Sequence, residues 1–191
     1  MRLFVAAEIG DTLAARAADL ISDLQQRVSA SAPRARLTWA ASDRLHITIR
    51  FIGEVDEGRA AAIRTALEPR LDVEPFELVL AGAGAFPGSG PPRVVWAGIE
   101  KGRDWLIAVE REIGARLAAL GLPADTRPYS PHLTLARVKK AEGLRSARLF
   151  EGLADRQIGT TRIDAITLFQ SRLSPKGSQY AALLRTPLKG R

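Results

Sequence analysis

Cysteine is absent from the 191 residues of this chain, and histidine occurs only twice. Without cysteine the chain can form no disulfide, thiolate metal site, iron–sulfur cluster or cysteine nucleophile. Long apolar runs are also missing, because no stretch approaches the roughly 18 residues that cross a bilayer. The opening segment MRLFVAAEIG is a poor match to a secretory signal and is typical of a first strand. We expect a soluble cytoplasmic protein.

Positive charge is in excess. Lysine and arginine number 28 against 21 aspartate and glutamate residues, which gives a net charge of +7. A polyanion such as nucleic acid would suit this balance, and arginine binds phosphate oxygens through two parallel hydrogen bonds. An arginine-rich composition is also what a GC-rich genome encodes. The charge alone therefore leaves open the choice between RNA binding and a merely basic surface.

Hydrophobic periodicity predicts both helices and strands. Helices are expected over residues 11–28, 56–71, 104–120 and 141–150. Strands are expected over residues 2–8, 37–39, 45–52, 76–80, 93–99, 132–138, 162–170 and 180–184. Residues 81–92 are rich in glycine, proline and serine and predict a loop, and residues 174–177 predict a turn. Because the helices fall between hairpins and do not alternate strictly with strands, the prediction is an α+β fold.

Each half of the chain has a helix that leads through a loop into the same four-residue pattern, His-hydrophobic-Thr-hydrophobic. The two copies are His46-Ile47-Thr48-Ile49 and His132-Leu133-Thr134-Leu135. We expect residues 1–191 to form a single domain of two pseudo-symmetric lobes. In this bilobal arrangement two antiparallel sheets face a central groove, and the helices pack outside.

Both histidines of the chain open this pattern. Threonine occupies ten of the 191 positions, so a threonine two residues after each histidine would arise by chance about once in four hundred. Residues i and i+2 of a strand share a face, so each imidazole should project together with the hydroxyl that follows it. If a pseudo-twofold axis relates the two halves, the two His-Thr faces look at each other across the groove.

Two imidazoles and two hydroxyls suit phosphoryl transfer. A neutral imidazole can take a proton from water while a protonated one gives a proton to the leaving oxygen. The hydroxyls of Thr48 and Thr134 can donate to non-bridging phosphate oxygens. This chemistry requires no metal, and we expect no cofactor. One alternative is that each histidine is a satisfied polar residue on a half-buried strand. Another is a zinc site, which would need three or four ligands.

At these residues the chain resembles the 2H phosphoesterase superfamily, specifically the RNA 2′,3′-cyclic phosphodiesterase family, whose members are also known as bacterial 2′-5′ RNA ligase-like proteins. The similar segments follow the family's order and span nearly the whole chain. They are MRLFVAAEI, LTWAASDRLHITIRFIGEV, GAFPGSGPPRVVWAGI, RPYSPHLTLARV and LFQSRLSPKGSQYAAL.

The resemblance implies an enzyme that hydrolyses the terminal 2′,3′-cyclic phosphate of RNA to a 2′-phosphomonoester. Carried over by position, His46 would be the proton donor and His132 the proton acceptor, with Thr48 and Thr134 on phosphate oxygens. Some relatives also join RNA ends through a 2′-5′ linkage. Two alternatives stay open: a 2H phosphodiesterase for another nucleotide substrate, and an RNA-binding module without turnover.

Two arginines are further candidates for substrate binding. The family's second motif is commonly followed by an arginine, and Arg137 matches it. Strict alternation would put Arg137 on the face opposite His132, so it reaches the groove only if the strand bends; otherwise it is a solvated charge. Arg50 shares the parity of His46, with a salt bridge as its alternative role. No feature of the sequence argues for self-association, and we expect a monomer.

Overall fold

The computed structural model describes residues 1–122, 128–174 and 177–190, so the turn expected at 174–177 lies partly outside the described residues. The strands form two sheets in which neighbouring strands pair antiparallel. Sheet A contains, in order, β3 (His46–Glu54), β1 (Arg2–Glu8), β8 (Ala165–Ser174) and β9 (Gly177–Pro187). Sheet B contains β2 (Arg36–Trp39), β6 (Leu133–Lys140), β5 (Val94–Lys101), β4 (Phe76–Phe86) and β7 (Gln157–Ile163). The expected α+β class and the two antiparallel sheets are confirmed.

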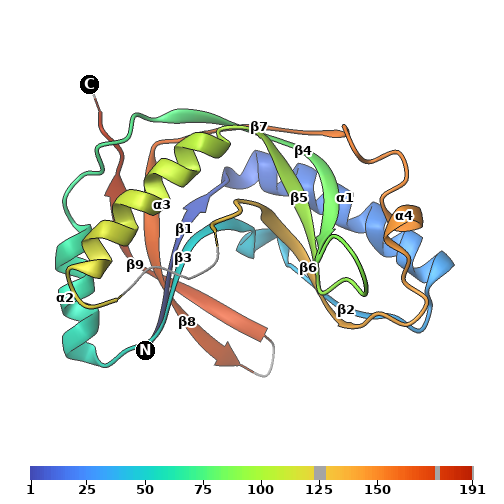
Figure 1. Ribbon diagram of the computed structural model, residues 1–191, viewed down its shortest axis with the longest axis horizontal. Helices are drawn as coiled ribbons and strands as arrows, with labels where there is room; N and C mark the ends of the chain where they lie inside the picture. Colours follow the sequence, from blue (N-terminus) through green and yellow to red (C-terminus); the bar gives the residue numbers. More distant parts are fainter. Residues whose placement is uncertain (123–127, 175–176, 191) are drawn as a thin grey trace.

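The helices pack on the outer faces of the sheets, and the two long ones are exchanged between them (Figure 1). Helix α1 (Gly10–Ser31) follows β1 of sheet A but packs against β7 of sheet B. Helix α3 (Arg103–Ala118) follows β5 of sheet B but packs against β3 of sheet A, with α2 (Glu57–Leu67) beside it. In the described part of the chain, no helix is long and apolar enough to cross a membrane.

Helix α1 shows how the sequence pattern produces this packing. Its apolar residues recur every three or four positions, so they form one stripe that is buried against sheet B. The polar side chains lie on the opposite, exposed face. The buried residues of α1 are Leu13, Ala17, Leu20, Ile21, Leu24 and Val28.

The strand orders of the two sheets correspond. The order β3-β1-β8-β9 in sheet A matches β6-β5-β4-β7 in sheet B, and β2 is an additional strand at the β6 edge. The unit β1-α1-β3 therefore corresponds to β5-α3-β6. In each unit a glycine with positive φ stands where the strand turns into the helix, Gly10 at 69° and Gly102 at 94°, a conformation that other residues rarely adopt. Buried residues from both sheets and from α1, α2 and α3 form one apolar core.

Several predicted boundaries need correction. Strand β4 continues to Phe86, so residues 81–86 are not part of a loop. The small residues there admit close neighbours: a Cβ on Gly84 would lie 2.5 Å from the Trp96 ring. Strand β7 was not predicted as a separate strand, and the helix expected over 141–150 is reduced to α4 (Ser146–Leu149). Helix α2 ends at Leu67, two residues before Pro69, which has no backbone N–H to continue the helical hydrogen bonds.

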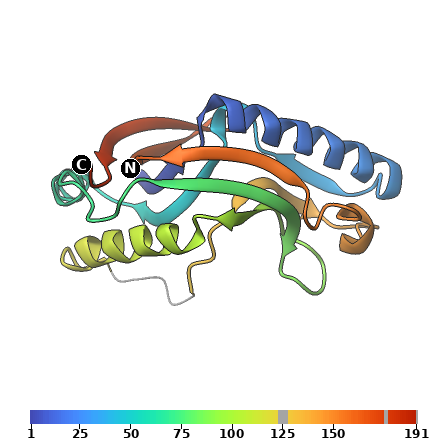
Figure 2. The ribbon, with the colours of Figure 1, turned by 90° about the horizontal axis from the view of Figure 1, so that it is seen from above.

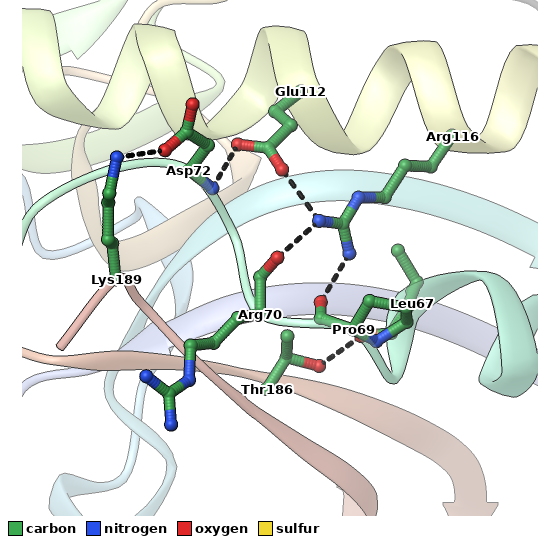
Figure 3. Close-up of polar contacts among 8 residues, drawn as sticks. All are labelled: Leu67, Pro69, Arg70, Asp72, Glu112, Arg116, Thr186 and Lys189. Carbon is green, nitrogen blue, oxygen red and sulfur yellow. Dashed lines mark hydrogen bonds and ion pairs between the residues drawn. The ribbon is translucent and has the colours of Figure 1, made fainter.

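A polar network fastens the segment after α2 and the C-terminal strand to α3 (Figure 3). The guanidinium of Arg116 on α3 donates to the carbonyl oxygen of Arg70 at 2.6 Å and to the carboxylate of Glu112 at 2.6 Å. Glu112 in turn accepts from the backbone N–H of Asp72 at 2.9 Å. Lys189 pairs with Asp72 at 2.6 Å. Figure 2 shows both chain ends at the end of the molecule where α2 lies.

Candidate active site

The two His-Thr motifs occupy corresponding strands. His46 opens β3, and His132 immediately precedes β6. The alternate residues Ile47 and Leu133 are fully buried in the apolar core, and this burial determines which face of each strand points toward the core. We call the face of each sheet that carries its histidine and threonine the motif face. The helices cover the opposite face.

The motif faces meet where β3 approaches β6, with Cα atoms of the two strands within 8 Å. Tyr129, three residues before His132, donates its hydroxyl to the backbone carbonyl of Thr48 at 3.0 Å. Arg137 of β6 acts electrostatically on both imidazoles, since it lowers the pKa of His46 and of His132. The structure thus brings both motifs and one arginine to a single place.

Both imidazoles are oriented by the same local hydrogen bond. Nδ1 of His46 lies 2.8 Å from the carbonyl oxygen of Arg44, and Nδ1 of His132 lies 2.8 Å from that of Ser130. A carbonyl can only accept, so Nδ1 carries a proton in each ring and Nε2 is the nitrogen that can exchange one. In both cases the partner stands two residues earlier in the chain.

Aromatic rings pack against each histidine. The centroid of the His46 ring is 5.1 Å from that of Phe4 and 5.3 Å from that of Tyr180, which meets it edge-on. The His132 ring meets Phe86 edge-on at 5.1 Å. Burial among these groups is the largest cause that lowers the pKa of both histidines below the ordinary value of 6.5, because it disfavours the charged form. At neutral pH the free protein therefore holds both rings mainly neutral.

A β-bulge interrupts β3 just after Thr48. The register with β1 shifts there, so Ile49 and Arg50 are both buried, at 3% and 7% exposure, while Phe51 is 62% exposed. A bulge reverses the alternation beyond it. Arg50 consequently lies on the helix-covered face, where its guanidinium pairs with Glu110 of α3 at 2.9 Å. The parity argument that placed Arg50 beside His46 is therefore wrong, and the salt-bridge alternative describes its position.

The equivalent bulge in β6 places the arginine of that strand on the motif face. The register with β5 shifts just after Thr134, and Leu135 and Ala136 are both buried. Arg137 is exposed on the motif face, where its charge reaches both imidazoles. The bend that Arg137 required is present. Arg137 and Phe51 occupy equivalent positions, each five residues after its histidine.

A cavity of about 560 Å³ opens beside His46. Its wall joins the short 3₁₀ helix η1 (Ser42–Arg44) to β9, since Arg44 donates to the carbonyl oxygen of Ser178 at 2.8 Å. The lining combines ionisable and aromatic side chains. The lining residues are Glu8, Asp43, Arg44, Leu45, His46, Phe169, Ser178, Gln179 and Tyr180.

Comparison with known proteins identifies the family. The model of the 2′-5′ RNA ligase superfamily matches residues 11–174. The chain belongs to this superfamily. An RNA 2′,3′-cyclic phosphodiesterase of Aeropyrum pernix is 37% identical over 142 residues, which cover 74% of this chain and 80% of that protein. One of Archaeoglobus fulgidus is 32% identical over 185 residues, which cover 96% and 98%.

The fold of this superfamily member also matches a solved structure. The crystal structure of TT0787 of Thermus thermophilus has a TM-score of 0.79 and 27% sequence identity, over 100% of this chain and 99% of that one. The family resemblance and the 2H phosphoesterase fold expected from the sequence are confirmed.

The structure adds groups to the site of this 2′-5′ RNA ligase superfamily member that the sequence did not indicate. Tyr129 was visible next to the second motif, but nothing local shows that its hydroxyl reaches β3. Glu8 ends the first strand, and its pairing with His46 depends on sheet register. Within the described residues, no group of three or more His, Asp or Glu side chains is arranged to hold a metal ion.

Proposed function

We propose that this protein is an RNA 2′,3′-cyclic phosphodiesterase that opens the terminal cyclic phosphate to a 2′-phosphomonoester without a metal ion. The observation that carries the proposal is the convergence of two oriented imidazoles, two threonines and Arg137 at the junction of the motif faces. Relatives named for this activity support it, at up to 37% identity. One chain supplies every group of the site, so the proposal includes a monomer with residues 1–191 as one domain. We also propose that the protein is cytoplasmic.

His132 is the base in this proposal. Its neutral Nε2 removes a proton from water as the water oxygen forms a bond to phosphorus. The carbonyl of Ser130 keeps the Nδ1 proton in place, so the imidazolium that forms retains a hydrogen-bonded partner. The resulting positive charge lies beside the phosphate, which carries negative charge throughout.

His46 is the acid. Its protonated Nε2 gives a proton to the 3′ oxygen as the phosphorus–O3′ bond breaks, so the products are a 3′-hydroxyl and a 2′-phosphate. During one turnover His132 gains a proton and His46 loses one. Proton exchange with solvent then restores the starting protonation state of both. A 5′-hydroxyl of a second RNA in place of water would instead produce a 2′-5′ linkage.

Thr48, Thr134 and Arg137 bind the phosphate. The hydroxyls donate to the non-bridging oxygens, and the guanidinium offsets the charge that accumulates on them in the transition state. Phe51, exposed on the motif face of sheet A, offers a ring on which a base can stack.

The decisive experiment uses an oligoribonucleotide that ends in a 2′,3′-cyclic phosphate, incubated in EDTA. The wild type should yield the 2′-phosphate, and His46→Ala and His132→Ala should each lose at least about 10²-fold in kcat. Thermal melting of the variants shows whether they fold. Adding an RNA with a free 5′-hydroxyl tests joining in the same assay.

The outcomes separate the alternatives. RNA that binds without turnover would indicate a binding module, and turnover of a different cyclic or linear nucleotide would indicate another substrate. A 3′-phosphate product would reverse the leaving group. Activity that survives either histidine substitution would eliminate the paired mechanism.

A further inference from the structure

The two histidines have the same local surroundings but differ in one charged neighbour. Glu8 of β1 is the register partner of His46 in β3, and both residues line the cavity beside His46. The Glu8 carboxylate is oriented from the next strand, because the buried Thr167 of β8 donates its hydroxyl to Oε2 at 2.7 Å. A negative charge is thus fixed next to one imidazole.

Sheet B has no side chain at the corresponding position. Ala6 pairs with Thr48 and Trp96 pairs with Thr134, so the residue that corresponds to Glu8 is Gly98, two positions after Trp96. A Cβ on Gly98 would lie 2.6 Å from the carbonyl oxygen of Ala81 in β4. The backbone of sheet B therefore excludes a carboxylate where sheet A has one.

The other charged groups around His46 do not create this difference. The charge of Arg137 of β6 lowers the pKa of both imidazoles and so acts on them in the same direction. From η1, Arg44 and the highly exposed Asp43 line the same cavity and lie 3.7 Å from each other as an ion pair. From β9, Tyr180 contributes its ring edge.

We propose that Glu8 is a positioning residue that favours protonation of His46 over His132 and thereby makes His46 the acid, while His132, opposite a glycine, is left as the base. This inference rests on the proposed function. The two motifs are symmetric and do not distinguish the acid from the base. The charged neighbour of His46 does. In support, burial lowers the pKa of both histidines, but Glu8 opposes this lowering at His46, whereas the other causes that act on the pKa of His132 are the Ser130 carbonyl and Arg137.

The test follows the imidazole signals by NMR, which is simple because the chain has only two histidines. His46→Ala assigns them. Glu8→Gln keeps the length of the side chain and an oxygen that can accept from Thr167, but removes the charge. We expect it to lower the pKa of His46 and to leave that of His132 in place. Glu54→Gln, at the far end of the same strand pair, is the matched control and should move neither.

Kinetics supply the second readout. In Glu8→Gln the alkaline limb of the kcat/KM profile should move to lower pH, with a several-fold loss above the optimum and little change on the acid limb. Glu8→Asp keeps the charge, so it should retain most of the wild-type profile and serves as the folded comparison if Glu8→Gln is unstable. Unchanged His46 titration in Glu8→Gln, or equal shifts of both histidines, would overturn the proposal.

The NMR result is independent of turnover. If the His46 pKa falls as expected but the wild type opens no cyclic phosphate, the proposed function fails while the electrostatic role of Glu8 stands. If the wild type is active and activity falls in Glu8→Gln with an unchanged pH profile, Glu8 has only a structural role and the inference fails.

Discussion

Each histidine is set for proton transfer by a contact that the chain makes within two residues. The carbonyls of Arg44 and Ser130 occupy Nδ1 of the two rings, so Nε2 is left for the reacting atoms. The aromatic packing beside each ring restricts its rotation and removes water. The same packing disfavours the imidazolium form, which gives the site a distinct pH dependence.

We predict a bell-shaped profile of kcat/KM against pH whose centre lies below 6.5. The acid limb follows the base, His132, and the alkaline limb follows the acid, His46, and burial lowers the pKa of both from 6.5 in the free enzyme. The centre of such a profile is the mean of the two pKa values, and this holds whichever histidine has the lower pKa. Rates measured between about pH 4.5 and 8.5 at substrate concentrations well below KM provide the check. A maximum above pH 6.5 would contradict it.

The residues that the sequence could identify are those whose role is written in a local pattern. His46, Thr48, His132 and Thr134 follow from the repeated motif, and the resemblance added Arg137. Glu8 could not be identified in this way, because its importance arises from the pairing of strands that are far apart in the chain. The inward position of Arg50 depends on a bulge, and alternation counted from His46 cannot reveal a bulge.

At the scale of secondary-structure elements, the bulges after Thr48 and Thr134 determine which side chains enter the site. Both strands have the same exposure pattern, with two buried residues in succession before an exposed one. The bulge turns Arg50 toward α3 and turns Arg137 toward the two histidines. Two arginines with similar sequence contexts therefore serve stability in one case and, in the proposed mechanism, substrate binding in the other.

This separation predicts opposite phenotypes for two alanine variants. Arg50→Ala leaves Glu110 in a poorly solvated position and should reduce the free energy of unfolding by about 3 kcal/mol, with kcat/KM largely retained at a temperature where the variant is folded. Arg137→Ala should change stability little, because the side chain is exposed, and should lower kcat/KM by about 10²-fold. Urea unfolding and steady-state kinetics on both variants measure the pair. Loss of activity without loss of stability in Arg50→Ala would show that the assignment of the faces is incorrect.

Strand boundaries were predictable where side chains alternate and failed where they are small. Residues 81–86 look like a loop because alanine and glycine have low strand propensity. In the structure these residues pair with both neighbouring strands and leave room for the Trp96 ring. Gln157–Ile163 was not predicted as a separate strand for a related reason. Gly159 and the polar residues around it lack the alternation of a strand, although this segment pairs with β4.

At the scale of the whole molecule, the exchange of α1 and α3 between the sheets joins the two lobes. Each sheet obtains the cover of its buried face from a helix that starts on the other sheet, and the buried residues form one core. The site lies at the junction of the lobes, so its geometry depends on both. The repeated pattern in the sequence indicated two similar halves, but the exchange itself is not encoded in any local signal.

We therefore predict that damage to one lobe unfolds the other. In a Trp105→Phe background the remaining tryptophans, Trp39 and Trp96, report on sheet B. Adding Ile113→Ala, at a fully buried position of α3 over sheet A, should destabilise the protein by about 3 kcal/mol.

The fluorescence midpoint in urea should fall with that substitution and should coincide with the midpoint from far-ultraviolet circular dichroism. Arg111→Ala, at an exposed position of the same helix, is the control and should move neither midpoint by much. A fluorescence midpoint that stays in place while the circular dichroism splits into two steps would mean that sheet B folds without sheet A. In that case the junction of the motif faces would form by docking of two independent units. Variants on the outer face of sheet A would then lower activity in proportion to the fraction of undocked molecules, with sheet B still folded.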